Sequence, residues 1–198
     1  MKKSLGCALV VIVLVVVVLG IAVAGSYNRL VGLQEGVETA WGEVENQYQR
    51  RADLVPNLVA TVKGAADFEQ ETFTQVTEAR ARVGQVQLTG LPDAQQLERF
   101  QQAQGELSSA LSRLLVVVER YPELTATQAF RDLQVQLEGT ENRIAVARGR
   151  YNEAAQAYNT TRRRFPAVLV AGLMGFDQRP YFEAQEGAEE VPRVDFRE

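Results

Sequence analysis

The polar side chains that are best placed to form a site lie on either side of one proline, Pro56, inside a helical pattern. A proline within a helix has no N–H and leaves a backbone carbonyl without its donor, so polar groups are needed nearby. One candidate set precedes and follows the proline: Asn46, Arg50, Arg51, Asp53 and Asn57. A second set lies further along the chain: Glu119, Glu141, Arg143, Arg148, Tyr151 and Asn152. The two sets are complementary, and they predict charge-assisted hydrogen bonds between helices.

Two interpretations of these residues stay open. In the first they form a structural network that fixes the register of neighbouring helices, which is the usual role of polar groups inside helical bundles. In the second they form an interaction or ligand-binding site. The structural interpretation is favoured.

Residues for familiar catalytic and metal sites are missing. The chain has no histidine, and Cys7 is its one cysteine, within an apolar run. This composition argues against zinc sites, Cys–His nucleophiles and di-iron centres that need Glu-x-x-His. Ser108 and Ser109 have no histidine base, and neither a phosphate-binding glycine loop nor a Gly-x-Ser-x-Gly motif is present. We expect no catalytic residues, no metal, no cofactor and no enzymatic activity.

The charge balance also excludes one class of partner. The chain of 198 residues carries 21 basic and 25 acidic side chains, a formal net charge of −4. Nucleic-acid binding depends on a positive surface that releases counterions. We expect no nucleic-acid partner.

The N-terminal segment predicts a membrane anchor. Residues 5–24 are uncharged, and a helix of that length reaches roughly 30 Å, the thickness of a hydrocarbon core. Lys2 and Lys3 precede this segment and only Arg29 follows closely, so the positive-inside rule places the N-terminus in the cytoplasm and the rest outside. Cleavage after Ala24 is the alternative, because Ala-Val-Ala-Gly has the spacing that signal peptidase accepts. The length of the apolar run favours an uncleaved signal anchor.

The remaining chain reads as long helices. Apolar side chains recur in steps of three and four from Tyr27 onward: Leu30, Leu33, Val37, Trp41, Val44 and Tyr48. This pattern continues past Pro56, which predicts a bend near 51–55 instead of a stop. Beyond Gly64 the helix is expected to resume and then to end in the stretch 84–90.

Two further helical stretches follow, at 93–120 and 125–164, and a short one at 167–174. We therefore predict an all-α fold, an elongated antiparallel bundle of three long helices plus a short fourth over residues 27–176. The long seam at 125–164 has coiled-coil-like spacing. The first bundle helix should continue from the membrane helix with little linker.

The C-terminal stretch 177–198 is acidic. Its last part, Glu183 to Glu198, holds six acidic residues against Arg193 and Arg197, which is typical of a mobile extension. The segment from Val191 to Phe196 is apolar enough to dock, and we favour docking on the bundle or on a neighbour.

The segment WGEVENQYQRRADLVPNLVATV, residues 41–62, resembles the signature of the LemA family of bacterial membrane-anchored proteins. Further similar segments follow in the family's order: Glu119 to Pro122, Thr140 to Asn159, Phe165-Pro166, Gly175-Phe176 and Tyr181-Phe182. The resemblance implies a helical bundle behind a membrane segment, in a family without an assigned enzymatic activity. Ala66 and Phe68 stand where the family more usually has an aromatic residue and a histidine, so a histidine-dependent role is in doubt.

These observations give two hypotheses of function. The first is a non-enzymatic scaffold in the bacterial cytoplasmic membrane, with its bundle outside the cytoplasm. It would form homo-oligomers through its long helices or bind other membrane and envelope proteins. The alternative is a sensor whose bundle binds a small molecule or peptide near Arg50, Arg51 and Asn57.

Overall fold

The structure is a computed structural model that describes residues 2–63, 70–86, 88 and 90–183, with side chains from residue 10 onward. Six α-helices and no strand occur in these residues. They are α1 (Lys2–Lys63), α2 (Gln70–Gln85), α3 (Ala94–Val118), α4 (Pro122–Thr125), α5 (Gln128–Arg162) and α6 (Ala167–Met174). The predicted all-α class is confirmed.

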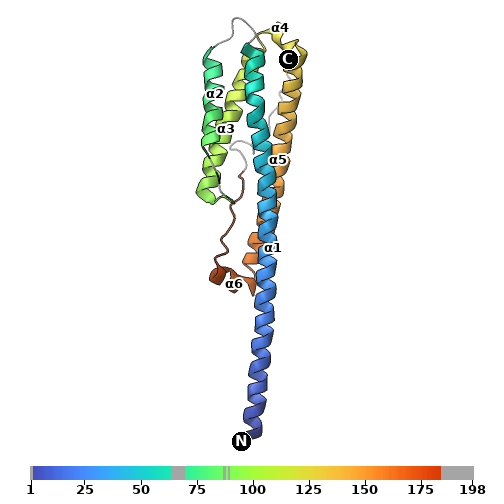
Figure 1. The fold of residues 1–198 in the computed structure, drawn as a ribbon, viewed down its shortest axis with the longest axis vertical. Helices are drawn as coiled ribbons and strands as arrows, with labels where there is room; N and C mark the ends of the chain where they lie inside the picture. Colours follow the sequence, from blue (N-terminus) through green and yellow to red (C-terminus); the bar gives the residue numbers. More distant parts are fainter. Residues whose placement is uncertain (1, 64–69, 87, 89, 184–198) are drawn as a thin grey trace, which may run out of the picture.

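The bundle consists of α1, α2, α3 and α5, which alternate in direction, while the N-terminal part of α1 extends far beyond the other helices (Figure 1). The sequence predicted three long helices, but α2 is a separate helix that turns back against α1 and packs on α3. Its stripe of Phe73, Val76 and Ala79 is buried against α1 and α3. A straight continuation of α1 would leave this stripe in water, so apolar burial favours the fourth bundle helix.

Helix α1 connects the apolar segment to the bundle without a break, as predicted. Its 62 residues correspond to a length of roughly 90 Å. The large apolar side chains from Val10 to Leu19 are all exposed, and in the described part of the chain α1 alone is long and apolar enough to cross a membrane. The N-terminus of α1 is therefore compatible with a membrane anchor.

Helix α1 continues through Pro56, as the sequence predicted. Its ring removes the N–H that would bond the carbonyl of Ala52, and Arg80 Nε from α2 donates to that oxygen at 3.1 Å. The side chain of a neighbouring helix thus supplies the missing donor. The bend expected near 51–55 stays a prediction.

Two hydrophobic clusters fill the bundle. The cluster nearer the apolar end joins α1, α3, α5 and α6 around Trp41, Phe100 and Tyr151. The distal cluster joins α1, α2, α3 and α5 around Val62, Val76 and Leu114, among others. The apolar stripe of α1 runs through both.

The chain after α6 returns along α5 (Figure 1). Gly175 ends α6 with φ of 71°, a left-handed conformation that glycine adopts without strain. From there the segment 176–183 lies against the bundle, so the stretch beginning at residue 177 is in part packed. The docking predicted for Val191 to Phe196 and the departures at Ala66 and Phe68 lie outside the described residues.

Candidate functional site

Arg51 occupies a position in α1 where the helical spacing calls for an apolar side chain. Tyr48 and Val55, three residues before and four after it, are buried core residues, and Arg51 itself is only 2% exposed. An unpaired charge in such a place is very costly, so its partners decide whether the fold tolerates it.

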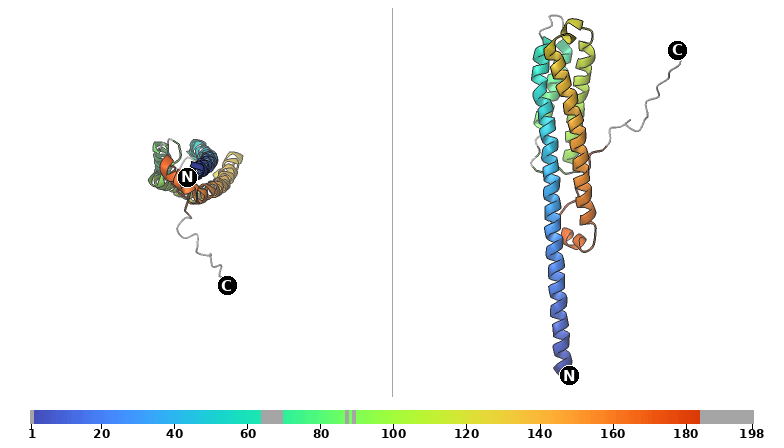
Figure 2. Two further views of the ribbon diagram at one scale, coloured as in Figure 1. Left: turned by 90° about the horizontal axis from the view of Figure 1, so that it is seen from below. Right: turned by 90° about the vertical axis from the view of Figure 1, so that its right-hand side faces the viewer.

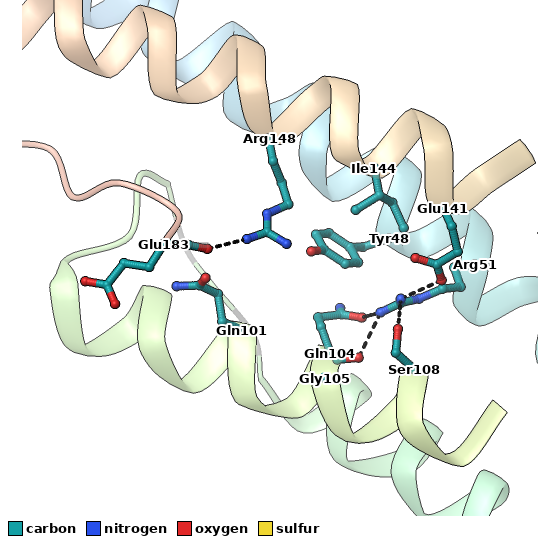
Figure 3. A pocket seen from close by; sticks show the side chains of 10 residues that line it. All are labelled: Tyr48, Arg51, Gln101, Gln104, Gly105, Ser108, Glu141, Ile144, Arg148 and Glu183. Carbon is teal, nitrogen blue, oxygen red and sulfur yellow. Dashed lines mark hydrogen bonds and ion pairs between the residues drawn. The ribbon is translucent and has the colours of Figure 1, made fainter. Parts of the chain in front are cut away.

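The Arg51 guanidinium bonds to two other helices (Figure 3). Its Nη1 donates to Glu141 Oε1 on α5 at 2.8 Å and to Ser108 Oγ on α3 at 2.6 Å. Its Nη2 donates to the Oε1 and the backbone oxygen of Gln104, at 2.6 and 3.1 Å. We call Arg51, Gln104, Ser108 and Glu141 the polar layer. It ties three helices together at one height.

The polar layer is asymmetric in its burial. Gln104 is 4% exposed, whereas the Glu141 side chain is 44% exposed and remains in contact with water. The carboxylate therefore keeps much of its hydration while it neutralises Arg51, which lowers the cost of burying the pair. The layer fixes the relative height and rotation of α1, α3 and α5.

A cavity of about 110 Å³ lies beside the polar layer (Figure 3). It is lined by Tyr48, Arg51, Gln101, Gln104, Gly105, Ser108, Glu141, Ile144, Arg148 and Glu183. Burial raises the pKa of Tyr48, and the charges of Arg148 and Arg51 partly offset that rise. The cavity can hold a few water molecules or a small ion but is smaller than the roughly 300–1,000 Å³ of typical small-molecule sites.

Two asparagines on α5 hold the returning C-terminal segment. Asn152 donates to the carbonyl of Phe182 and accepts from its N–H, both at 2.9 Å. Asn159 does the same with the backbone of Arg179, at 2.8 and 2.9 Å. Because the two asparagines are seven residues apart, they lie on one face of α5. Together they hold an extended segment of the chain against that helix.

The side chain of Phe182 completes this attachment. Its ring stacks on Trp41 with centroids 6.0 Å apart and meets Tyr151 edge-on at 5.4 Å. The Arg148 guanidinium lies 4.9 Å from the Phe182 ring centre, and Arg148 Nη2 donates to the carbonyl of Glu183 at 2.7 Å. Burial raises the pKa of Tyr151 to about 12, with a smaller opposing effect from Arg179.

The structure divides the predicted polar residues into three groups. Arg51 and Glu141 meet in the polar layer, while Arg148, Tyr151 and Asn152 hold the C-terminal segment. The others have exposed side chains on the outside of the helices: Asn46, Arg50, Asp53, Asn57, Glu119 and Arg143. Asp53 accepts from Gln49 on its own helix, and none of the five residues predicted around Pro56 supplies the donor to the freed carbonyl.

The sequence interpretation missed Gln104, Ser108, Arg80 and Asn159. Gln104 had a signal, because it lies in step with Phe100, Leu107 and Leu111 in the buried stripe of α3. A polar residue in such a stripe predicts a buried partner. Asn159 had no comparable signal, because it binds backbone atoms of Arg179.

The fold defines an all-helical bundle protein whose apolar N-terminal helix is compatible with a membrane anchor. The chain belongs to the LemA family, since the family's sequence model matches residues 40–196. The resemblance seen in the sequence is thereby confirmed.

Individual relatives include the magnetosome protein MamQ 2 of Paramagnetospirillum magneticum, which is 28% identical over 176 residues. That match covers 79% of this chain and 64% of the relative, so the chain spans less than two thirds of the relative's length. The magnetosome protein MamQ of Magnetospirillum gryphiswaldense is 26% identical over 174 residues, with the same two coverages. Protein LemA of Metamycoplasma hominis is 21% identical over 171 residues, covering 86% of this chain and 73% of the relative.

Proposed function

We propose that this protein is a non-enzymatic, membrane-anchored scaffold of the bacterial cytoplasmic membrane. The anchor is the apolar part of α1, with Lys2 and Lys3 on the cytoplasmic side and the bundle outside. The outer faces of the long helices bind further copies of the chain and other membrane or envelope proteins.

The observation that carries this proposal is the internal pairing of the polar layer. Both terminal nitrogens of Arg51 donate hydrogen bonds to Gln104, Ser108 and Glu141, so the guanidinium holds α1, α3 and α5 together. Buried polar groups of this kind specify helix pairing in bundles. A bundle whose interior is used for its own structure offers its surface for function.

One surface suits association. Val135 and Val146 are exposed on α5, eleven residues apart and therefore on one side of the helix. That side is opposite the buried stripe of Leu137, Ile144 and Tyr151. Exposed valines on an otherwise polar helix face provide an apolar contact that a second copy can cover.

The mass of the full chain in detergent micelles tests this proposal. We expect an oligomer, which Val146→Glu shifts to monomer by placing a charge in the contact. Val116→Glu is the matched control, since Val116 is also an exposed valine but lies on α3. A wild-type chain that is monomeric at all concentrations, with no partner crosslinked to it in membranes, contradicts the proposal.

The proposed orientation has its own test. A reporter fused after Glu198 should be active only outside the cytoplasm. Activity confined to the cytoplasmic side would reverse the orientation without affecting the association.

The cavity beside Arg51 bears on the alternative, a sensor that binds a small molecule or peptide. Its volume of about 110 Å³ and its position against the C-terminal segment favour water or a small ion over a larger ligand. A compound that raises the melting temperature of the wild type and not of Arg51→Met would support the sensor instead.

A further inference from the structure

Helix α6 is apolar on all sides, yet only part of its surface is covered. Ala167, Val170 and Ala171 are buried against the bundle. On the other side Leu169 and Leu173 are 58% and 84% exposed, and Val168 and Met174 are exposed as well. A short helix that is apolar all round is normally buried on every side, so the exposed side of α6 calls for an apolar environment.

The position of α6 indicates which environment that is. Phe176, two residues after α6, packs edge-on against Tyr27 with ring centres 5.7 Å apart. Tyr27 is three residues beyond the apolar segment 5–24 of α1. Three helical residues rise only about 4.5 Å, which lies within the headgroup region next to a hydrocarbon core.

The direction of α6 fits the same environment. It lies crosswise to α1 at the lower end of the bundle, where α1 emerges alone (Figures 1 and 2). If α1 crosses the bilayer, α6 runs along its surface. Short helices that rest in the interface bury one apolar side among the headgroups and upper acyl chains in this way.

The charges next to α6 are also suitable. Arg163 and Arg164 directly precede the turn into α6 and have exposed side chains, and Arg29 is exposed on the adjoining turn of α1. Arginine forks pair well with the phosphates of phospholipids. Apolar and basic groups thus occur together at the level where headgroups are expected.

We propose that α6 is a second membrane contact, an interfacial helix that inserts Leu169, Leu173 and Met174 into the bilayer surface beside the anchor. Two contacts fix the tilt of the bundle, whereas α1 alone leaves it free to lean. The inference rests on the proposed anchoring through α1. The occupant of the exposed side of α6 is therefore the lipid surface and not a second copy of the chain.

Fluorescence quenching in nanodiscs tests this inference on the full chain. In a Cys7→Ser background, one cysteine at a time replaces Val16, Leu173 or Val116 and carries an environment-sensitive dye. Val16 reports on the anchor, and Val116, exposed at the distal end of α3, is the control outside the membrane. Nanodiscs of phospholipids with brominated acyl chains are compared with the same lipids without bromine.

We expect brominated lipid to lower the fluorescence at Val16 and Leu173 and to leave Val116 unchanged. Leu169→Glu should weaken the quenching at Leu173, while Val116→Glu should leave it unaltered. Quenching at Val16 with none at Leu173, where aqueous iodide quenches instead, would overturn the inference and preserve the anchor.

Two further outcomes are distinguishable. A Leu173 dye shielded from both iodide and brominated lipid would show that protein covers α6, which also overturns the inference. Absence of quenching at Val16 as well would refute the anchoring itself.

Discussion

Replacing Arg51 separates the energetic roles of the polar layer. Arg51→Ala removes four hydrogen bonds and leaves the side chain of Gln104, which is 4% exposed, without its charged donor. Breaking a buried ion pair costs about 3–5 kcal/mol, and the 44% exposure of the Glu141 side chain places this case at the lower end. We expect a loss of about 3 kcal/mol, with a contribution from the cavity left in the α1 stripe.

Arg51→Met distinguishes the charge from the volume. Methionine fills much of the same space in the apolar stripe. The remaining loss of folding stability, about 1–3 kcal/mol, comes from the side-chain oxygen of Gln104, which no longer has a donor. The double change Arg51→Met with Gln104→Leu removes that penalty too. It should restore the stability to the wild-type value or above, as other buried ion pairs do when replaced by packed apolar side chains.

Urea unfolding of the full chain in a mild detergent, followed by circular dichroism, measures these differences. Arg50→Ala is the control, because Arg50 is the exposed neighbour of Arg51 and its removal should change stability by less than about 0.5 kcal/mol. An Arg51→Ala chain as stable as the wild type would refute the argument. A stable double variant that no longer assembles would show that the polar layer serves function as well as structure.

Three other changes test the remaining contacts. Tyr151→Phe should cost little at neutral pH, since the Tyr151 hydroxyl has no hydrogen-bond partner among the described residues. Because the pKa of Tyr151 is raised to about 12, its neutral form contributes stability that is complete below pH 10 and lost as the pH rises to 12; the variant should flatten this loss in alkaline melting curves. Asn152→Ala should speed hydrogen exchange of the Phe182 amide, measured by mass spectrometry, and should lower the free energy of unfolding by about 1–3 kcal/mol. Unchanged exchange would refute the role of Asn152 in holding the C-terminal segment. Arg80→Met should lower the free energy of unfolding by about 1 kcal/mol through the Ala52 carbonyl, a loss that thermal melting would detect.

Most of the fold could be predicted from the helical spacing of the apolar residues. The stripe of α1 was readable on both sides of Pro56, and the short α6 was predicted at its observed position, 167–174. The separation of α2 from α1 was not readable from spacing, because Phe73, Val76 and Ala79 continue a helical pattern in either arrangement. Their burial against α1 and α3 favours a separate α2, and this burial exists only in the assembled bundle.

The polar residues were harder to assign than the helices. Glu141 and Arg143 are two residues apart on α5 and both were candidates, yet only Glu141 is turned toward the neighbouring helices. The phase of the buried stripe at Leu137, Thr140 and Ile144 favours position 141, so this distinction was available in the sequence.

The hydrogen bonds by which Asn152 and Asn159 hold the C-terminal segment could not be derived from the sequence in the same way. Asn152 binds backbone atoms of residue 182, thirty positions along the chain. Backbone partners leave no pattern in side-chain types. Only the path of the returning segment along α5 reveals them.

The scaffold proposal is tested most directly by disulfide crosslinking of the full chain in membranes, with Val146→Cys in a Cys7→Ser background. The proposal predicts a crosslinked dimer that forms under mild oxidation and is absent when Gln102, exposed on α3, is the replaced residue. Equal crosslinking at both positions, or none at either, would contradict association through the outer face of α5.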